Sequence, residues 1–178
     1  MHAVEGLRID TLGVPANHGR IGMCCCPGRN HPLASSADWQ RDLGADLEVI
    51  QAWGASILVT LMESFELQEY GVADLPERAG GLGLDWLHLP IRDMDIPGRD
   101  FTRRWREHGA DIRRRLGRGE SIVIHCLGGL GRTGTVAACL LTEFGLQPEQ
   151  AIRAVRKVRP GAIQTRAQED WVRRLQAR

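Results

Sequence analysis

The segment SIVIHCLGGLGRTG, residues 121–134, carries the strongest structural signal in this sequence. Residues 121–125 form a short apolar run, which is typical of a buried strand in a parallel sheet. A glycine-rich loop follows, and residues 132–144 then predict a helix that ends at Gly145. A strand, a glycine-rich loop and a helix N-terminus in this order predict an anion-binding cradle at the carboxyl edge of an α/β sheet.

The loop contains the residue types that phosphate binding requires. Its glycines let successive backbone N–H groups turn inward toward an anion, and the positive end of the following helix points at the same spot. Arg132 adds a planar fork that can bind two phosphate oxygens at once. The predicted phosphate-binding residues are therefore Leu127, Gly128, Gly129, Leu130, Gly131 and Arg132.

Cys126 lies at the base of this cradle and is predicted to be a catalytic nucleophile. The positive surroundings stabilise a thiolate, which faces the bound phosphate and can attack phosphorus in line while Arg132 stabilises the equatorial oxygens. Thr133 places a hydroxyl near the sulfur, where it can help the thiolate leave in a second step. His125 is expected to orient the loop through hydrogen bonds to the backbone, because its side chain points away from that of Cys126.

Length and composition predict a single soluble domain that spans residues 1–178. The formal net charge of +1 gives no bulk attraction to nucleic acid or to an anionic membrane. No apolar run approaches the ~20 residues that span a bilayer, and the first residues lack the pattern of a signal peptide. We therefore expect a cytoplasmic monomer with neither a nucleic-acid partner nor a membrane partner.

The cysteines do not predict a disulfide framework or a metal site. There are five of them, and three are adjacent, at positions 24–26. Adjacent side chains on a strand point in opposite directions, so these three cannot all face one metal ion. The segment 21–26 is instead predicted to be a buried strand in a reducing compartment.

Alternating strand and helix patterns outline the rest of the chain. The predicted strands are 7–12, its partner 20–26, 56–61 and 84–89, in addition to 121–125. The predicted helices are 38–53, 63–70, 100–116, 132–144, 148–159 and the segment from residue 164 onward, with Asp38 and Asp100 as N-caps. This order predicts a mainly parallel central α/β sheet that is flanked by helices on both faces.

Four segments resemble the protein tyrosine phosphatase superfamily, and within it the dual-specificity branch, in particular the cyclin-dependent-kinase-associated phosphatase group. They are 124–132, 137–141, 148–152 and 161–165, and the likeness extends from Ile21 to the last predicted helix. That group has Ser at the position of Thr133, a change that keeps the hydroxyl. The resemblance implies a dual-specificity phosphatase-like fold and a phosphoric monoester hydrolase that works through a cysteinyl-phosphate intermediate and needs no cofactor.

Ester cleavage also needs a proton for the leaving oxygen, and a positioned acid contributes about 10²–10⁴ in rate. Asp93 and Asp95 cannot be separated from the residues alone. The resemblance selects Asp93, because the acid of the family lies four residues before a proline, here Pro97. It also implies that Gln164 positions the water that hydrolyses the intermediate, and that Glu66 supports the site without taking part in the chemistry.

The sequence narrows the substrate class without naming a substrate. Residues 127–130 include no Lys or Arg, whereas the inositol-lipid phosphatases of the superfamily place basic residues there. We therefore expect a phosphorylated protein, with phosphotyrosine as the substrate and phosphoserine or phosphothreonine as further substrates. A phosphatase of a small metabolite, a phosphoinositide or an RNA 5′ end is an alternative, and so is a phosphate-binding module without activity. Of the 23 basic residues only Lys157 is Lys, a skew typical of a GC-rich, bacterial genome.

Overall fold

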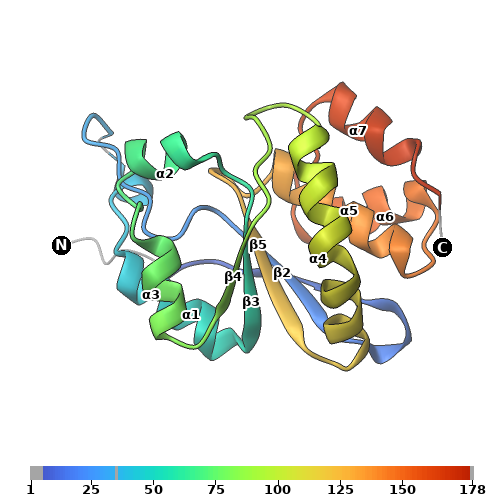
Figure 1. Cartoon of the computed structure of the whole chain (residues 1–178). Coiled ribbons are helices and arrows are strands. Elements are labelled where there is room, and N and C mark those ends of the chain that lie inside the picture. The colour runs from blue at the N-terminus through green and yellow to red at the C-terminus, as the bar shows by residue number, and fades with distance from the viewer. Residues whose placement is uncertain (1–5, 35, 177–178) are drawn as a thin grey trace.

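A five-stranded sheet in the order β1-β2-β5-β3-β4 forms the centre of the molecule (Figure 1). The computed structural model describes residues 6–34 and 36–176. β1 pairs with β2 in antiparallel fashion and all other neighbours are parallel, which confirms the predicted mainly parallel sheet. The strands are β1 (Asp10–Gly13), β2 (Arg20–Cys24), β3 (Ala55–Thr60), β4 (Asp85–His88) and β5 (Ser121–His125).

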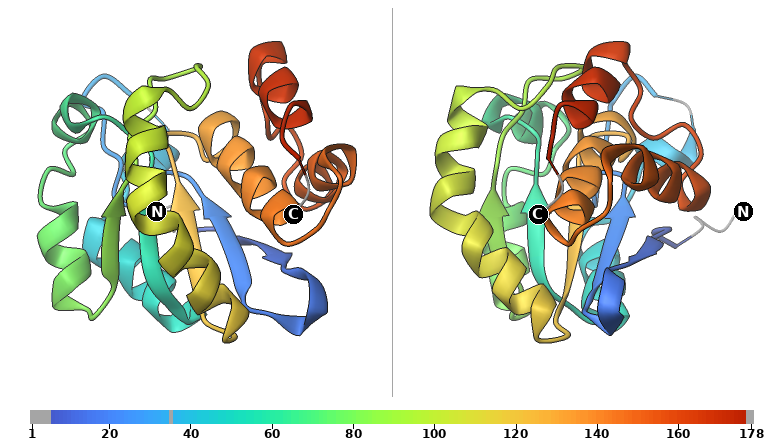
Figure 2. Two further views of the ribbon diagram at one scale, coloured as in Figure 1. Left: turned by 45° about the vertical axis from the view of Figure 1, so that its right-hand side comes forward. Right: turned by 90° about the vertical axis from the view of Figure 1, so that its right-hand side faces the viewer.

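Helices cover both faces of the sheet, as the sequence predicts (Figures 1 and 2). Three helices after β2 and β3 lie on one face, and the four later helices lie on the other. The chain crosses the sheet in opposite directions from β2 to β3 and from β4 to β5, and right-handed crossovers then place the connecting helices on opposite faces. The first group is α1 (Leu43–Trp53), α2 (Ser64–Glu69) and α3 (Leu75–Gly81), and the second is α4 (Arg99–Gly117), α5 (Gly131–Glu143), α6 (Pro148–Val158) and α7 (Arg166–Arg173).

β5 occupies the middle of the sheet and delivers the glycine-rich loop to its carboxyl edge. All five of its residues are buried, because it pairs with β2 on one side and with β3 on the other. His125 stands opposite Cys24 of β2 and Thr60 of β3. The loop that follows His125 therefore begins between two other strand ends, at the edge where parallel α/β sheets bind ligands.

The predicted N-cap of the first helix, Asp38, is wrong. Asp38 lies in a 3₁₀ turn (Ala37–Trp39), and a β-bridge between Asn30 and Gln40 follows it. That bridge interrupts the predicted helix, so α1 begins only after Asp42, whose carboxylate accepts a hydrogen bond from the backbone N–H of Ala45 at 2.7 Å.

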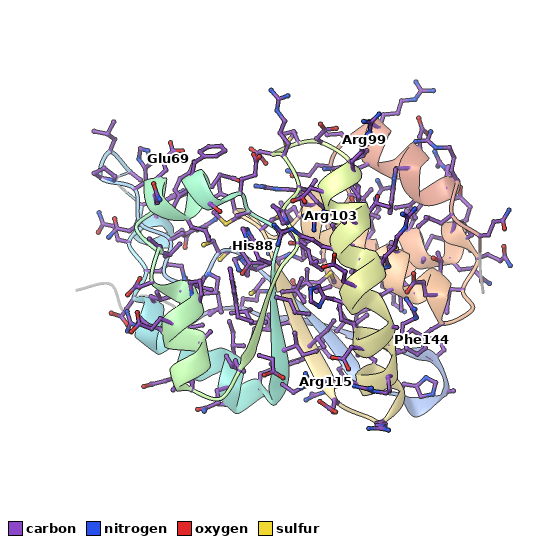
Figure 3. The ribbon with its side chains drawn as sticks, in the orientation of Figure 1. Glu69, His88, Arg99, Arg103, Arg115 and Phe144 are labelled. Carbon is purple, nitrogen blue, oxygen red and sulfur yellow. The ribbon has the colours of Figure 1, made fainter. Side chains whose placement is uncertain are left out.

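The N-cap of α4 is Gly98 rather than the predicted Asp100. Asp100 already lies in the first turn, where its carboxylate pairs with Arg103 and Arg104. Figure 3 labels Arg103 and Arg115 on this helix, and Arg115 pairs with acids on β4 and just before β5. The many arginines of α4 thus belong to an exposed, ion-paired helix face.

Other boundaries shift by a few residues. The first strand begins at Asp10 rather than at residue 7, and the last helix begins at Arg166 rather than at Gln164. α3 has no counterpart in the prediction. The predicted strand 21–26 already ends at Cys24, so that two of the three adjacent cysteines belong to the loop that follows.

Two of the three adjacent cysteines lie in the protein interior. Cys24 and Cys26 are buried, and burial raises the pKa of both thiols. Within the described residues, no disulfide joins any of the five cysteines. Within the described residues there is no group of three or more His, Cys, Asp or Glu side chains that could hold a metal ion. None of the helices in that part of the chain has the length and apolar character to cross a membrane.

Candidate active site

The glycine-rich loop between β5 and α5 depends on one glycine for its backbone conformation. Gly129 has φ +69°, and a Cβ there would lie 2.1 Å from the carbonyl oxygen of Cys24. A Cβ on Gly128 would meet nothing within 4 Å. Gly131 has a different task, because its missing side chain leaves room for the amides of Gln164 and Gln168. Of the three predicted loop glycines, Gly129 and Gly131 are therefore required by their surroundings, and Gly128 is not.

Two arginines from other parts of the chain bind the outward-facing carbonyls of this loop. Arg159 donates to the carbonyl oxygens of Gly129 at 2.5 Å and Gly128 at 3.1 Å, and its third nitrogen pairs with Asp10 at 2.7 Å. Arg29 donates to the carbonyl of Leu127 at 3.1 Å. In a trans peptide the N–H points opposite to the carbonyl, so the N–H groups that follow these three consecutive carbonyls point away from the two arginines, which suits an anion cradle.

Arg132 is buried and fixed by a bidentate ion pair. Its two terminal nitrogens donate to the carboxylate of Glu66 at 2.8 and 3.0 Å, and one of them also donates to the carbonyl of Ile91 at 3.1 Å. The Glu66 carboxylate accepts a third bond, from the backbone N–H of Glu63. This pairing holds the guanidinium plane in one orientation, and the Nε of Arg132 has no partner among the described residues.

The loop between β4 and α4 brings Asp93, and not Asp95, to this arginine. A carboxylate oxygen of Asp93 lies 3.0 Å from Nη2 of Arg132, and the Asp93 side chain is 58% exposed. Met94 adopts a left-handed backbone (φ +61°), and its N–H donates to the same Asp93 oxygen. Among the described residues, the carboxylate of Asp95 accepts a hydrogen bond only from the N–H of Ile96, so Asp95 caps its own loop.

Gln164, just before α7, and Gln168, in the first turn of α7, approach the start of α5. A Cβ on Gly131 would lie 2.8 Å from the Gln164 side-chain oxygen and 3.0 Å from that of Gln168. Gln168 is completely buried. Its oxygen accepts from the N–H groups of Gln164 and Thr165, and its nitrogen donates to the carbonyl of Asp95 at 3.1 Å. Gln168 therefore connects the acid-bearing loop to the segment that carries Gln164.

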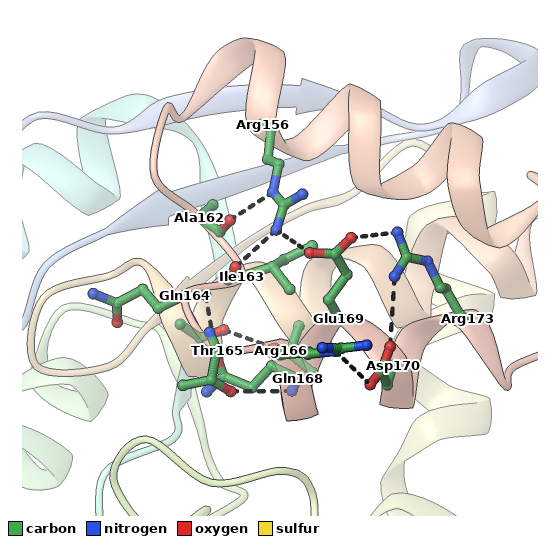
Figure 4. A network of polar contacts seen from close by, with 12 residues as sticks. Arg156, Ala162, Ile163, Gln164, Thr165, Arg166, Gln168, Glu169, Asp170 and Arg173 are labelled. Carbon is green, nitrogen blue, oxygen red and sulfur yellow. Dashed lines mark hydrogen bonds and ion pairs between the residues drawn. The ribbon is translucent and has the colours of Figure 1, made fainter.

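A second set of bonds fixes that segment against α6, as Figure 4 shows. Arg156 donates to the carbonyls of Ala162 and Ile163 at 3.0 and 2.9 Å and pairs with Glu169 at 2.8 Å. The N–H of Ile163 donates to the carbonyl of Leu130. The segment before α7 is thus tied both to α6 and to the glycine-rich loop.

His125 is buried and neutral, and its tautomer can be deduced. Burial lowers its pKa to about 3. The indole N–H of Trp86 donates to the Thr60 hydroxyl oxygen at 2.8 Å, so the hydroxyl proton is available for the Nε2 of His125, 2.7 Å away. Nε2 is then the acceptor, and Nδ1 carries the proton toward the carbonyl of Cys126 at 3.4 Å. A neutral imidazole bonded in this way contacts the backbone at Cys126 and is not set up to act as a base.

Thr133 and Cys126 are both buried at the start of the loop and helix. The hydroxyl of Thr133 has no hydrogen-bond partner among the described residues. A buried hydroxyl without a partner is costly, and the Thr133 hydroxyl can still take a hydrogen-bond partner.

The fold therefore gathers the predicted residues at one sheet edge. Glu66 and Asp93 contact Arg132, and Gln164 reaches Gly131. Sequence reasoning missed several supporting residues, because each makes its key bond to backbone or to a residue far away in the chain: Arg29, Arg159, Gln168, Thr60 and Trp86. The sequence QTRAQ, residues 164–168, was the one signal that could have indicated Gln168.

Comparisons with known proteins agree with this geometry. The sequence profile described as PTP-SAK, Swiss Army Knife protein, DSP-PTPase phosphatase domain, matches residues 37–172. Cyclin-dependent kinase inhibitor 3 of Rattus norvegicus is 33% identical over 155 residues, which are 85% of this chain and 69% of that protein. The protein of the same name from Homo sapiens is 32% identical over the same shares.

Solved structures of phosphatases are similar over nearly the whole chain. A crystal structure of kinase-associated phosphatase, in which the catalytic-site cysteine is replaced by serine, has a TM-score of 0.81 and 29% identity, and the match covers 94% of this chain and 93% of that chain. The active form of Tk-PTP has a TM-score of 0.67 and 29% identity, with 93% and 97% coverage.

Proposed function

The chain belongs to the dual-specificity branch of the cysteine-dependent protein phosphatases, and from this membership we propose the residues that carry out the reaction. Cys126 is the nucleophile, Arg132 and the loop 127–131 hold the phosphate, and Asp93 is the acid. The observation that carries the proposal is the buried Arg132 guanidinium, which Glu66 fixes and Asp93 flanks at 3.0 Å. The serine replacement of the catalytic-site cysteine in the similar structure supports Cys126.

In the first step the Cys126 thiolate attacks phosphorus. A sulfur–phosphorus bond forms, and the bond from phosphorus to the ester oxygen breaks. Asp93 gives its proton to that oxygen, so that the leaving group departs as a neutral alcohol or phenol. Arg132 and the inward N–H groups of the loop stabilise the negative charge on the three equatorial oxygens.

In the second step water cleaves the cysteinyl-phosphate. Gln164 positions the water, and the Asp93 carboxylate accepts a proton from it as its oxygen bonds to phosphorus. The sulfur–phosphorus bond breaks, and Thr133 donates a hydrogen bond to the departing thiolate. The lack of any other partner for the Thr133 hydroxyl supports this role.

The substrate is proposed to be a phosphorylated protein. Phosphotyrosine is the proposed residue, with phosphoserine and phosphothreonine as further substrates. Residues 127–130 are uncharged, which favours a phosphorylated protein over a phosphoinositide as the substrate, although Arg29 and Arg159 lie just outside that loop. We also propose that residues 1–178 form one domain, that the protein is a monomer without a nucleic-acid partner, and that it works in the cytoplasm, where a catalytic thiol stays reduced.

The deciding experiment compares wild type with Cys126→Ser on p-nitrophenyl phosphate and on a panel of phosphopeptides, phosphoinositides and nucleotides. Hydrolysis in the presence of a chelator, and its loss in Cys126→Ser, are the expected results. Cys139→Ser, a buried cysteine of α5 outside the loop, is the matched control and should keep its activity. Activity that persists in Cys126→Ser would overturn the nucleophile, and turnover confined to metabolites or lipids would overturn the protein substrate.

A further inference from the structure

Large apolar side chains are exposed at the edge of the sheet that carries the phosphate loop. Among the described residues these side chains are Leu33, Phe65 and Met94, which are 89%, 60% and 53% exposed. They lie in the segments that follow β2, β3 and β4, and these three strands run parallel to β5. The segments therefore leave the sheet at the edge where the phosphate loop begins, and exposed apolar groups that gather in one region indicate a binding surface.

An apolar hollow of about 240 Å³ lies between two of these segments. It is lined by His31, Ala34 and Trp39 from the segment after β2, and by Tyr70 at the end of α2. Sites for drug-sized ligands have volumes of ~300–1,000 Å³, so this hollow suits one large side chain. The proposed mechanism uses none of the residues that line it.

The two sides of the hollow are joined to the phosphate site by separate routes. On one side, the Arg29 guanidinium lies 4.3 Å from the centre of the Trp39 ring and donates to the Leu127 carbonyl of the phosphate loop at 3.1 Å. On the other side, Tyr70 stands one helical turn after Glu66, the partner of the phosphate-binding arginine. A bound peptide advances about 3.3–3.6 Å per residue, so a side chain in the hollow belongs to a residue near the phosphorylated one.

The charges that act on Tyr70 agree with this position. Burial raises the pKa of Tyr70, and nearby carboxylates raise it further. Two of those carboxylates, Glu66 and Asp93, belong to the proposed active site, as does Arg132, which acts in the opposite sense. A phenol with a raised pKa is neutral at pH 7, so Tyr70 presents an uncharged ring to the hollow.

The rings of the hollow are held in place without a ligand. The centre of the Tyr70 ring lies 5.9 Å from the ring centres of His31 and Trp39. The backbone N–H of Asn30 donates to the carbonyl of Tyr70 at 3.0 Å, which joins α2 to the segment after β2 (Figures 1 and 2). Aromatic side chains that lose little freedom on binding contribute strongly to the affinity of an interface.

We propose that this hollow binds an apolar side chain of the substrate, on a residue within two positions of the phosphorylated one. The inference rests on the proposed function, because it requires a phosphorylated protein in the active site. The substrate is the occupant because the exposed Phe65 and Met94 directly adjoin Glu66 and Asp93 in the chain. The apolar surface thus reaches the active site, where a substrate chain must lie.

The test uses pairs of phosphotyrosine peptides in which one of the four residues nearest to the phosphotyrosine is Leu or Asn and the others are Ala. Leu and Asn have similar shapes and differ in polarity. At one of the four positions, wild type should hydrolyse the Leu peptide with about tenfold higher kcat/KM, which is the lower end of what one apolar group contributes in a pocket. Sodium chloride should not reduce this preference, because no ion pair is involved.

Ala34→Asp places a carboxylate in the hollow without removing a ring, and it should reduce the preference to less than twofold. Ala110→Asp is the matched control, because it makes the same change at an exposed residue of α4, on the other face of the sheet from α2. It should keep the tenfold preference. Each preference is a ratio of two peptides on one variant, so a general loss of activity cancels. A wild type without a preference at any of the four positions, or an equal loss in both variants, would overturn the proposal.

Each peptide is also measured as a competitive inhibitor of p-nitrophenyl phosphate hydrolysis. If no peptide is turned over, the protein substrate of the proposed function is wrong, but the inhibition constants still report on the hollow. Tighter inhibition by a Leu peptide than by its Asn partner, lost in Ala34→Asp and kept in Ala110→Asp, supports the proposal. Equal inhibition constants within every pair contradict it.

Discussion

Asp93 and Asp95 have the same side chain two positions apart, and their surroundings separate them. Asp93 lies beside Arg132, whereas Asp95 caps its own loop. Asp93→Asn should lower kcat by about 10²–10⁴ for an alkyl phosphate and much less for p-nitrophenyl phosphate, whose leaving group needs no proton. Asp95→Asn, which keeps the loop bond, is the control and should stay near wild type. Similar losses on both substrates in Asp93→Asn would show that Asp93 is not the acid.

His125 makes stability depend on pH. Its pKa is about 3 in the folded protein and about 6.5 in an unfolded chain, so the unfolded state binds more protons between these values. The stability that neutral His125 contributes is fully present above pH 6.5 and is lost as pH falls, on the order of 2 kcal/mol from pH 7 to pH 5. Urea unfolding across this range should show a shallower pH dependence for His125→Gln. Parallel curves for the two proteins would contradict the buried neutral state.

At the scale of an element, two glycines of the phosphate loop differ in backbone conformation and in the space around them. Gly129 has a left-handed backbone and a side chain there would collide with Cys24, whereas a side chain at Gly128 would meet open space. Gly129→Ala should therefore displace the loop and lower kcat by at least ~10², the size of the effect when one aligned backbone donor is lost. Gly128→Ala should stay within a few-fold. Both are measured with p-nitrophenyl phosphate and by urea unfolding, and equal behaviour of the pair would show that Cys24 does not constrain the loop.

The strand–loop–helix unit was predictable because each of its signals is local. Apolar residues 121–125 predict a buried strand, and β5 is one. The prediction of Asp38 as the N-cap of the first helix failed because the β-bridge from Asn30 to Gln40 is a tertiary contact that overrides the local helix preference of the sequence. For a related reason, the sequence alone could not assign a supporting role to Arg159 or Gln168. Their bonds go to backbone carbonyls of remote loops, and a carbonyl has no residue identity that a sequence pattern could reveal.

At the scale of the whole molecule, a contact between the two ends of the chain supports the active site. Asp10 on β1 pairs with Arg159 after α6, and Arg159 binds two carbonyls of the phosphate loop. Asp10→Asn should lower kcat several-fold although Asp10 touches no reacting atom. A double-mutant cycle of Asp10→Asn and Arg159→Lys, read from kcat/KM, should give a coupling of about 1 kcal/mol. Additive effects would mean that Asp10 does not act through Arg159.

The central position of β5 also decides when the enzyme can form during its synthesis. β2 and β3 leave the ribosome long before β5, yet they do not pair with each other in the finished sheet, because β5 lies between them. The nascent chain therefore has two apolar strands with open edges until residue 125 has emerged, and such edges are where chains aggregate. Pairings that join Cys24 to His125 and Thr60 to His125 also close long loops, which makes folding slow. The phosphate loop can therefore form only after β5 has inserted between β2 and β3. A nascent chain that stops before β5 has neither the nucleophile nor a complete sheet.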